Sequence, residues 1–147
     1  MAKRENILSN AKTSLENIKI SGGYYNNVHL VTREPTDWMK VQPDQVPGAW
    51  LLWTTDEREP RDVQGAHTLS TLTMRVRGIV YAKKNLEIEL NKFIDDVETS
   101  LMVDPTRGGN AMYTNPRSIR TFQGPSMFHI IFDFDFEVRY QYTQGSP

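Results

Sequence analysis

The sequence contains no cysteine. This absence excludes disulfides, thiolate zinc sites and cysteine nucleophiles, and it is typical of a chain that stays in a reducing compartment. Apolar runs of about 18 residues are also missing, so no membrane-spanning helix is expected. The polar start at residues 1–6 does not resemble a secretory leader. We therefore expect a soluble, untargeted chain that is stabilised by packing or by contacts between subunits.

An excess of charge of either sign is absent as well. Lys and Arg together number 17 against 18 Asp and Glu, which gives a net charge of −1. A protein that holds free nucleic acid electrostatically needs a basic field, so this class is not expected. The 147 residues, 38% of them hydrophobic, suffice for one globular core. The sequence predicts a single domain over residues 1–147.

Hydrophobic periodicity predicts the main elements. Apolar residues recur at helical spacing over 4–19 and 84–102, which indicates two amphipathic helices. Gly22 and Gly23 follow the first helix and are expected to end it. Strand patterns are predicted at residues 24–33, 49–55, 67–82, 111–122 and 128–142. The fourth strand contains Pro116 and is expected to be short or to lie on an edge.

Two connections have unusual compositions. Residues 34–48 are predicted to form a long loop that carries apolar side chains, and residues 56–62 a charged turn that faces water. The expected fold is α+β: one mostly antiparallel sheet of about five strands backed by two helices, in the order α-β-β-β-α-β-β.

The last strand alternates apolar residues with charged ones. Asp133, Asp135 and Glu137 share one face at about 6.5–7 Å spacing, and alternating carboxylates can hold Mg²⁺ or Mn²⁺ in nucleases. A metal-dependent nuclease or hydrolase is therefore one hypothesis. The other interpretation is a solvated face whose charges pair across strands, because Arg75 and Arg77 alternate in the same way on the other long strand. Since no glycine-rich phosphate loop or basic cluster accompanies the acids, we favour the second interpretation.

Other chemical motifs are not found. His29, His67 and His129 are too scattered for a local metal site, and the sequence has no His-Glu-x-x-His, Gly-x-Ser-x-Gly or Walker A pattern. We therefore predict a protein that is not an enzyme, with no catalytic residues, metal ligands or cofactors. A module that binds small molecules remains open, because it would depend on a closed apolar pocket.

Tryptophan and methionine mark candidate contact residues. Trp50 and Trp53 lie in an expected strand and are interpreted as core, whereas Trp38 has both a core and an interface interpretation. Met39 lies beside it in the proline-bearing loop. A neighbouring subunit that buries this loop would offset the entropy lost on ordering it, so we expect an oligomer.

The order of these elements resembles the tail terminator and minor tail protein family of long-tailed bacteriophages. The similarity spans nearly the full chain and depends on order more than on a short motif. The segments that carry it are the helix at 7–20, Gly22-Gly23-Tyr24, the strand at Trp50, the acidic turn at Asp56-Glu57, the helix at 86–101, Asp104 to Gly109, and the final strand ending in Tyr140-Gln141-Tyr142.

The resemblance implies a structural role without chemistry. The expected assembly is a homo-hexameric ring that caps the tail tube, stops tube polymerisation and joins the tail to a neck or head-completion protein. DNA would pass through its lumen without specific binding, and no membrane is involved. The expected location is the head-proximal end of the virion tail, assembled in the bacterial cytoplasm. Another neck or head-tail connector protein is the related alternative.

The resemblance also points to contact residues. Extended loops at 34–48, 56–66 and 104–118 are where contacts between subunits, or with the tube and neck, are expected. The candidate interface residues are Trp38, Met39, Asp56, Glu57, Arg58, Arg61, Arg107, Tyr113 and Arg117. Possible lumen-facing acids are Asp56, Glu57, Glu59 and Asp62.

Overall fold

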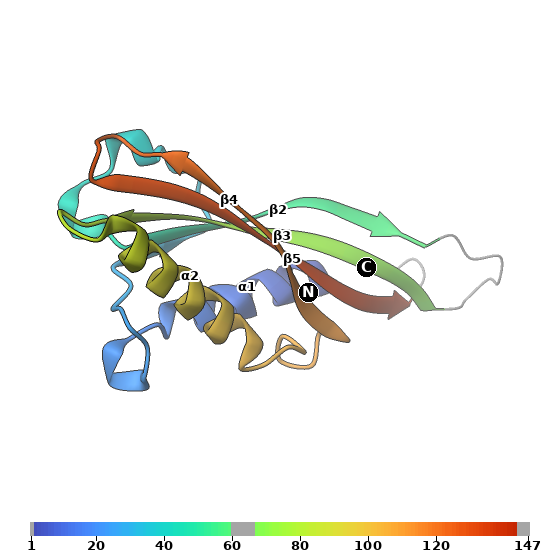
Figure 1. The fold of residues 1–147 in the computed structure, drawn as a ribbon. Coiled ribbons are helices and arrows are strands. Elements are labelled where there is room, and N and C mark those ends of the chain that lie inside the picture. Colours follow the sequence, from blue (N-terminus) through green and yellow to red (C-terminus); the bar gives the residue numbers. More distant parts are fainter. Residues whose placement is uncertain (1, 60–66, 144–147) are drawn as a thin grey trace.

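The computed structural model describes residues 2–59 and 67–143, in which five strands form one sheet with both long helices on the same face (Figure 1). The helices are α1 (Lys3–Glu16) and α2 (Leu86–Met102). The strands are β1 (Leu30–Thr32), β2 (Gly48–Arg58), β3 (His67–Tyr81), β4 (Tyr113–Gln123) and β5 (His129–Thr143). Short 3₁₀ turns are η1 (Ile20–Gly22), η2 (Trp38–Lys40) and η3 (Pro43–Gln45). The predicted α+β class and element order are confirmed.

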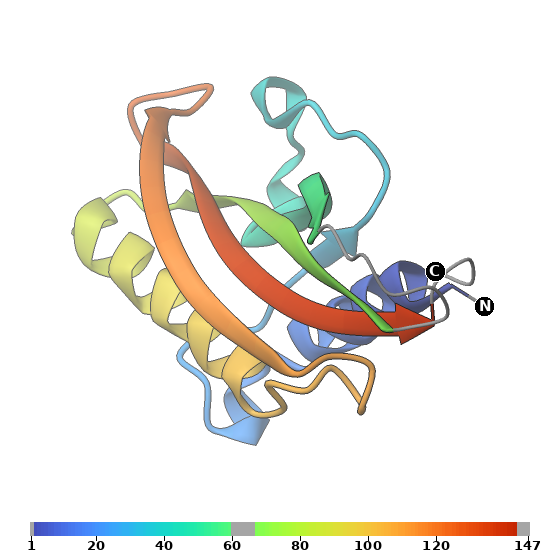
Figure 2. The same cartoon turned by 90° about the vertical axis from the view of Figure 1, so that its right-hand side faces the viewer.

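The strand order is β1-β2-β3-β5-β4. The short β1 pairs in parallel with β2, and the remaining neighbours are antiparallel. Figure 2 shows that the sheet is strongly curved, with β4 along one margin. In Figure 1, β2, β3 and β5 continue beyond the helices as a projecting arm. The helices therefore cover only part of one face, and the opposite face of the central strands is open except at the end where loop residues pack against Ile79 and Ile131.

The main core lies between the helices and the even-numbered residues of the two central strands. The predicted alternation in β5 is confirmed, since Phe132, Phe134 and Phe136 are buried. Phe93 of α2 meets Phe132 edge to face, with ring centroids 5.8 Å apart. Gly78 of β3 makes room for this ring, because a Cβ at residue 78 would lie 2.4 Å from a Phe132 ring carbon. The two long strands thus anchor both helices.

A second, smaller core lies on the opposite face. Trp38, Ile79 and Ile131 are its buried members, and loop residues Val41 and Val46 pack against them. The apolar side chains of the predicted long loop are therefore folded onto the chain's own sheet. This packing explains how the loop is ordered within a single chain.

The N-terminal predictions were too long. The first helix ends at Glu16, earlier than expected, and Gly23 with a φ of 93° closes η1. The predicted strand at 24–33 shortens to β1 because the backbone N–H groups of Tyr25 and Asn26 both donate to the Asp96 carboxylate of α2, at 3.0 Å each. Backbone groups bound to a helix side chain are not available to a neighbouring strand.

The predicted turn at 56–62 was wrong over its first residues, since β2 continues through Arg58. Pairs such as Asp56 with Leu72 and Arg58 with Ser70 extend its ladder with β3. For β4 the sequence predicts a strand that is short or lies on an edge, and the second of these is confirmed. The strand lies on an edge, with an irregularity between Pro116 and Ser118, but it is not short.

Candidate functional site

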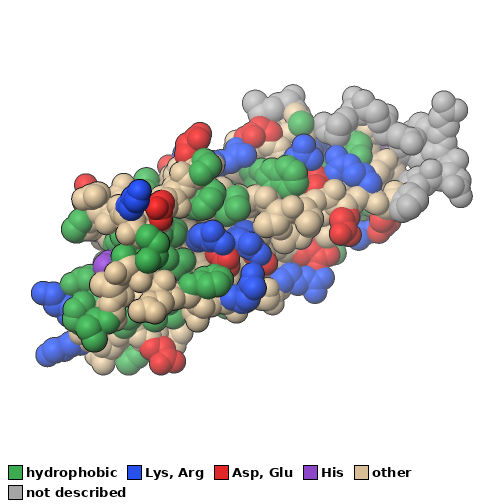
Figure 3. Space-filling view, turned by 90° about the horizontal axis from the view of Figure 1, so that it is seen from above, with side chains coloured by type: hydrophobic (Ala, Val, Ile, Leu, Met, Phe, Trp, Pro, Cys, Tyr) green, Lys and Arg blue, Asp and Glu red, His purple; other side chains and the backbone are tan. Residues whose placement is uncertain are grey.

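The open face of the sheet carries two fork-like ion pairs between the central strands. Arg77 Nε and Nη2 donate to the two carboxylate oxygens of Asp133 at 2.7 and 2.9 Å. One step along the strands, Arg75 Nε and Nη2 donate to Asp135 at 2.8 and 3.1 Å. Figure 3 looks onto this side of the molecule and shows blue and red side chains adjoining along its middle. The predicted cross-strand pairing is confirmed.

The local environment strengthens these pairs. Asp133 is only 2% exposed. Its hydrogen bonds raise the pKa of Arg77 above the ordinary value, against the opposing effect of burial, and Asp135 does the same for the pKa of Arg75. The Arg77 guanidinium also lies 5.7 Å from the centre of the Trp50 ring. Arg75 and Arg77 thus have their charge neutralised and their position fixed.

Two more ion pairs continue the pattern toward the arm. Arg117 of β4 donates to Glu137, and Arg139 of β5 donates to Glu59. Because acids and arginines occur side by side, the open face presents many guanidinium groups without a net basic field.

These contacts bear on the metal-site hypothesis. Asp133, Asp135 and Glu137 do share a face, as the strand period requires, but each accepts hydrogen bonds from an arginine. Over residues 2–59 and 67–143, no three carboxylate, histidine or cysteine side chains gather closely enough to share a metal ion. In this geometry the three carboxylates act as acceptors for arginine.

A second polar cluster surrounds Asp56 on the helix side of the sheet. One carboxylate oxygen accepts hydrogen bonds from Arg4 at 2.8 Å and from the Tyr140 hydroxyl at 2.6 Å, while Ser70 donates to the other at 2.7 Å. Arg58 forms an ion pair with the same carboxylate at 2.8 Å. The cluster therefore ties the start of α1 to β2, β3 and β5.

Burial in this cluster would by itself raise the pKa of Asp56, but the hydrogen bonds from Tyr140, Arg4, Arg58 and Ser70 outweigh it and hold the pKa below the usual 3.8. Burial and the neighbouring carboxylate raise the pKa of Tyr140. The Asp56 side chain is 3% exposed. This candidate interface residue is thus engaged in contacts within its own chain.

Trp38 and Met39 are adjacent but differ in environment. Trp38 is 3% exposed, and its indole Nε1 donates to the backbone oxygen of Arg77 at 3.1 Å. Met39 is 57% exposed. The core interpretation of Trp38 is therefore correct for this structure, and Met39 is the side chain of the pair that can reach a partner.

Arg107 lies inside the chain. It is fully buried and donates to the backbone oxygens of Leu101 and Asp104, which closes the end of α2. Burial lowers the pKa of Arg107. A cation at the C-terminus of a helix also complements the helix dipole. Arg107 therefore stabilises the end of α2 within its own chain, a role that the sequence did not predict.

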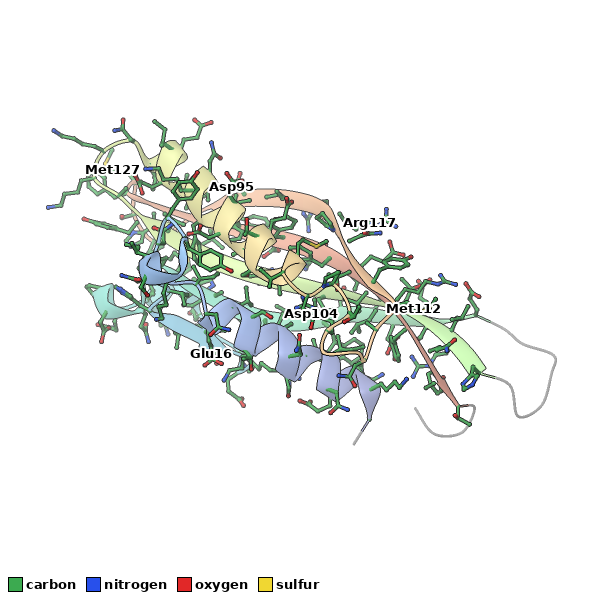
Figure 4. The ribbon with its side chains drawn as sticks, turned by 90° about the horizontal axis from the view of Figure 1, so that it is seen from below. Glu16, Asp95, Asp104, Met112, Arg117 and Met127 are labelled. Atoms are coloured by element: carbon green, nitrogen blue, oxygen red, sulfur yellow. The ribbon has the colours of Figure 1, made fainter. Side chains whose placement is uncertain are left out.

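The other candidate contact residues are more accessible. Glu57 and Arg58 are exposed on β2, and Tyr113 is half-buried at the start of β4. The Arg117 side chain is 60% exposed. Figure 4 shows it on β4, on the side of the sheet away from α1, with Met127 at the other end of the molecule. Arg61 and Asp62 lie outside the described residues.

Sequence reasoning missed a cavity of about 400 Å³ at the end of the molecule where the long loop meets the sheet. Its walls are mostly apolar, with a few polar groups. The lining residues are Asn26, Val41, Pro43, Val46, Pro47, Val80, Tyr81, Glu89 and His129. Burial lowers the pKa of His129, whose Nδ1 lies 2.7 Å from the Ser126 hydroxyl. The cavity can receive a small apolar group. Its walls come from segments that are far apart in the sequence, so no local motif predicts it.

Comparison of the chain with protein-family models and with curated protein sequences finds no match. Among the helices of the described residues, none has the length and apolar character needed to cross a membrane.

Proposed function

We propose that this chain is a tail terminator of a long-tailed bacteriophage. Copies form a ring on the end of the tail tube, stop the addition of tube subunits and offer the other side of the ring to a neck or head-completion protein. The observation that carries the proposal is the order of elements, α-β-β-β-α-β-β on one helix-backed sheet, because the resemblance to the terminator family rests on that order.

The shape of the subunit supports this role. The two ends of the subunit differ, because β2, β3 and β5 project beyond the helices at one end only, so the two sides of a ring built from it differ as well (Figure 1). Identical subunits close a ring when a head-to-tail contact repeats until the rotation is complete. Polymerisation of the tube ends when the exposed side of that ring no longer matches a tube subunit.

The charges of the open face suit contact with passing DNA. Free arginines would hold phosphates and slow the DNA, since each phosphate contact adds affinity. Here Arg75, Arg77, Arg117 and Arg139 are bound to carboxylates of the same face. Together with the net charge of −1, this supports a lumen that DNA crosses without specific binding.

The proposal defines the partners and the location. The partners are further copies in a hexameric ring, the tail tube protein and a neck or head-completion protein. The ring sits at the head-proximal end of the virion tail after assembly in the bacterial cytoplasm. No reaction step is required of any residue.

Electron microscopy of particles made without this protein tests the proposal. Expected are tubes of uncontrolled length without heads, and recovery of normal length when the wild-type chain is supplied from a plasmid. Tails of normal length that fail to join heads would instead assign the chain to the neck or connector proteins. Normal, joined particles would reject both roles.

A further inference from the structure

The sheet has two long edges without a strand partner in the described part of the chain. β4 pairs with β5 on one side only, and β1 covers only the first three positions of β2, Gly48 to Trp50. Residues 51–58 of β2 therefore pair with β3 alone. Unpaired backbone N–H and C=O groups along an edge are a template for another strand.

The directions of the two edges are complementary. β2 and β3 are antiparallel, β3 and β5 are antiparallel, and β5 and β4 are antiparallel. It follows that β4 runs opposite to β2. Two copies placed side by side in the same orientation therefore bring β4 of one against β2 of the next in the antiparallel sense, which is the more stable form of pairing.

The position of β1 sets a register for this contact. Because β1 occupies the first positions of the edge, an incoming β4 can meet β2 only from Leu51 onward, and the register that uses the whole free edge places Gln123 opposite Leu51. Both strands contain one irregularity, between Trp53 and Thr55 and between Pro116 and Ser118.

Once the irregularity of β2 is passed, Arg120 comes opposite Thr55 and Ser118 opposite Glu57. The members of each pair lie on the same face, since Thr55 and Glu57 are in register with odd-numbered residues of β3, and Ser118 and Arg120 with Asp135 and Asp133 of β5. The faces of the two edges match without any rearrangement of the strands.

The side chains of the two edges are also complementary. On β4, Arg120 is exposed and forms no ion pair with the described residues, and the same is true of Glu57 on β2. In the register above, Arg120 lies diagonally across from Glu57 on the same face. On the same face, the exposed ring of Phe122 comes opposite the half-exposed Leu52. Apolar contact adds affinity, and the charges fix register and exclude wrong partners.

We propose that the β4 edge of one copy pairs in the antiparallel sense with residues 51–58 of β2 in the next copy, so that one sheet runs continuously around the assembly. The occupant of each edge is thus a second copy of this chain. The inference rests on the proposed function, because it names the contact that builds the ring. The two edges differ, so the contact is head-to-tail, and the offset imposed by β1 supplies the stagger that a closed sheet needs.

Cysteine trapping tests this contact directly, because the natural chain has no cysteine. One chain carries both Thr55→Cys and Arg120→Cys, which two intervening strands keep apart within a copy. A matched control carries Thr55→Cys and Thr121→Cys, whose side chains lie on opposite faces of the sheet. Both are oxidised alone and in the presence of tail tubes, after circular dichroism has verified their folding.

The expected result is a ladder of disulfide-linked chains that ends at one closed size, with at least tenfold more cross-linking than in the control. Cross-linking no greater than that of the control, in both conditions, would overturn the inference.

A charge exchange tests the register independently. Glu57→Arg and Arg120→Glu are expected each to abolish assembly, measured as mass in solution or on tube ends. A one-to-one mixture is expected to assemble again, because every contact in an alternating ring then joins opposite charges. Single variants that assemble like the wild type, or a mixture that stays apart, would contradict the inference.

The two proposals fail in different ways. A ring of fixed mass without the Thr55 and Arg120 cross-link would overturn the edge pairing and leave the terminator function standing. Specific cross-linking together with tails of normal length in the absence of the protein would retain the edge pairing and overturn the function.

Discussion

Asp133 lies buried against the guanidinium of Arg77, which donates two hydrogen bonds to it across the β3–β5 pair. Both residues lie on the open face of the central strands, and the arginine on β3 fixes the position of the aspartate on β5. Removal of one member of such a pair leaves a charge that is shielded from water, which costs far more than the pair contributes as a whole.

We therefore predict that Arg77→Met lowers the free energy of unfolding by about 2–3 kcal/mol, measured by urea denaturation; the loss stays below that of an isolated buried charge because Arg75 Nε lies 3.7 Å from Asp133. The double variant Arg77→Met with Asp133→Leu should recover much of this loss, because no uncompensated charge remains. Arg33→Met, which breaks a more exposed pair with Glu5, is the control and should cost at most about 1 kcal/mol. A similar loss for both arginines would contradict the importance of burial.

A second prediction concerns acid sensitivity. The pKa of Asp56 is lowered in the folded chain, so its carboxylate stabilises the fold above the unfolded pKa of about 3.8 and loses this contribution as the pH falls through the folded value. Asp56→Asn should lower stability near neutral pH and flatten the decline of stability below about pH 4. Urea titrations from acid to neutral pH measure this, with the exposed Glu34→Gln as the matched amide control. An unchanged acid limb in Asp56→Asn would contradict the role of the cluster.

A third prediction separates two neighbouring loop residues. Trp38→Ala should lower the free energy of unfolding by about 3–5 kcal/mol, because it removes the centre of the second core. Met39→Ala should change it by no more than about 0.5 kcal/mol, since that side chain is mostly exposed. If the loop contacts the tube or a neighbour, Met39→Ala alone should weaken assembly at full stability. Equal loss of stability in both variants would refute this division.

The elements that could be predicted from the sequence are those governed by a local period. The alternation of apolar and charged residues in β5 defines a buried face by itself, and the repeat in α2 locates that helix almost to its bounds. The pairing of Arg75 and Arg77 with the acids of β5 follows from the same alternation. The face of a strand is fixed by the chain itself, so these predictions do not depend on distant contacts.

Trp53, interpreted as core, is instead 43% exposed on β2, where the centre of its ring lies 4.9 Å from the Arg4 guanidinium. The other main failures involve contacts between distant segments. The first strand is shorter than predicted because Asp96, far along the chain, binds the backbone of Tyr25 and Asn26. The prediction of a solvated turn at Asp56 is wrong because its partners Arg4 and Tyr140 come from opposite ends of the sequence, where no local pattern shows them. The cavity beside His129 likewise has no local signature.

The most direct test of a terminating function is the growth of tail tubes in vitro. Purified tube subunits are allowed to elongate short tubes, the chain is added, and tube lengths are measured by electron microscopy over time. We predict that growth stops and that a ring is visible on one tube end, while Glu57→Arg leaves elongation unaffected. Tubes that continue to lengthen at the same rate with the wild-type chain present would contradict the terminating function.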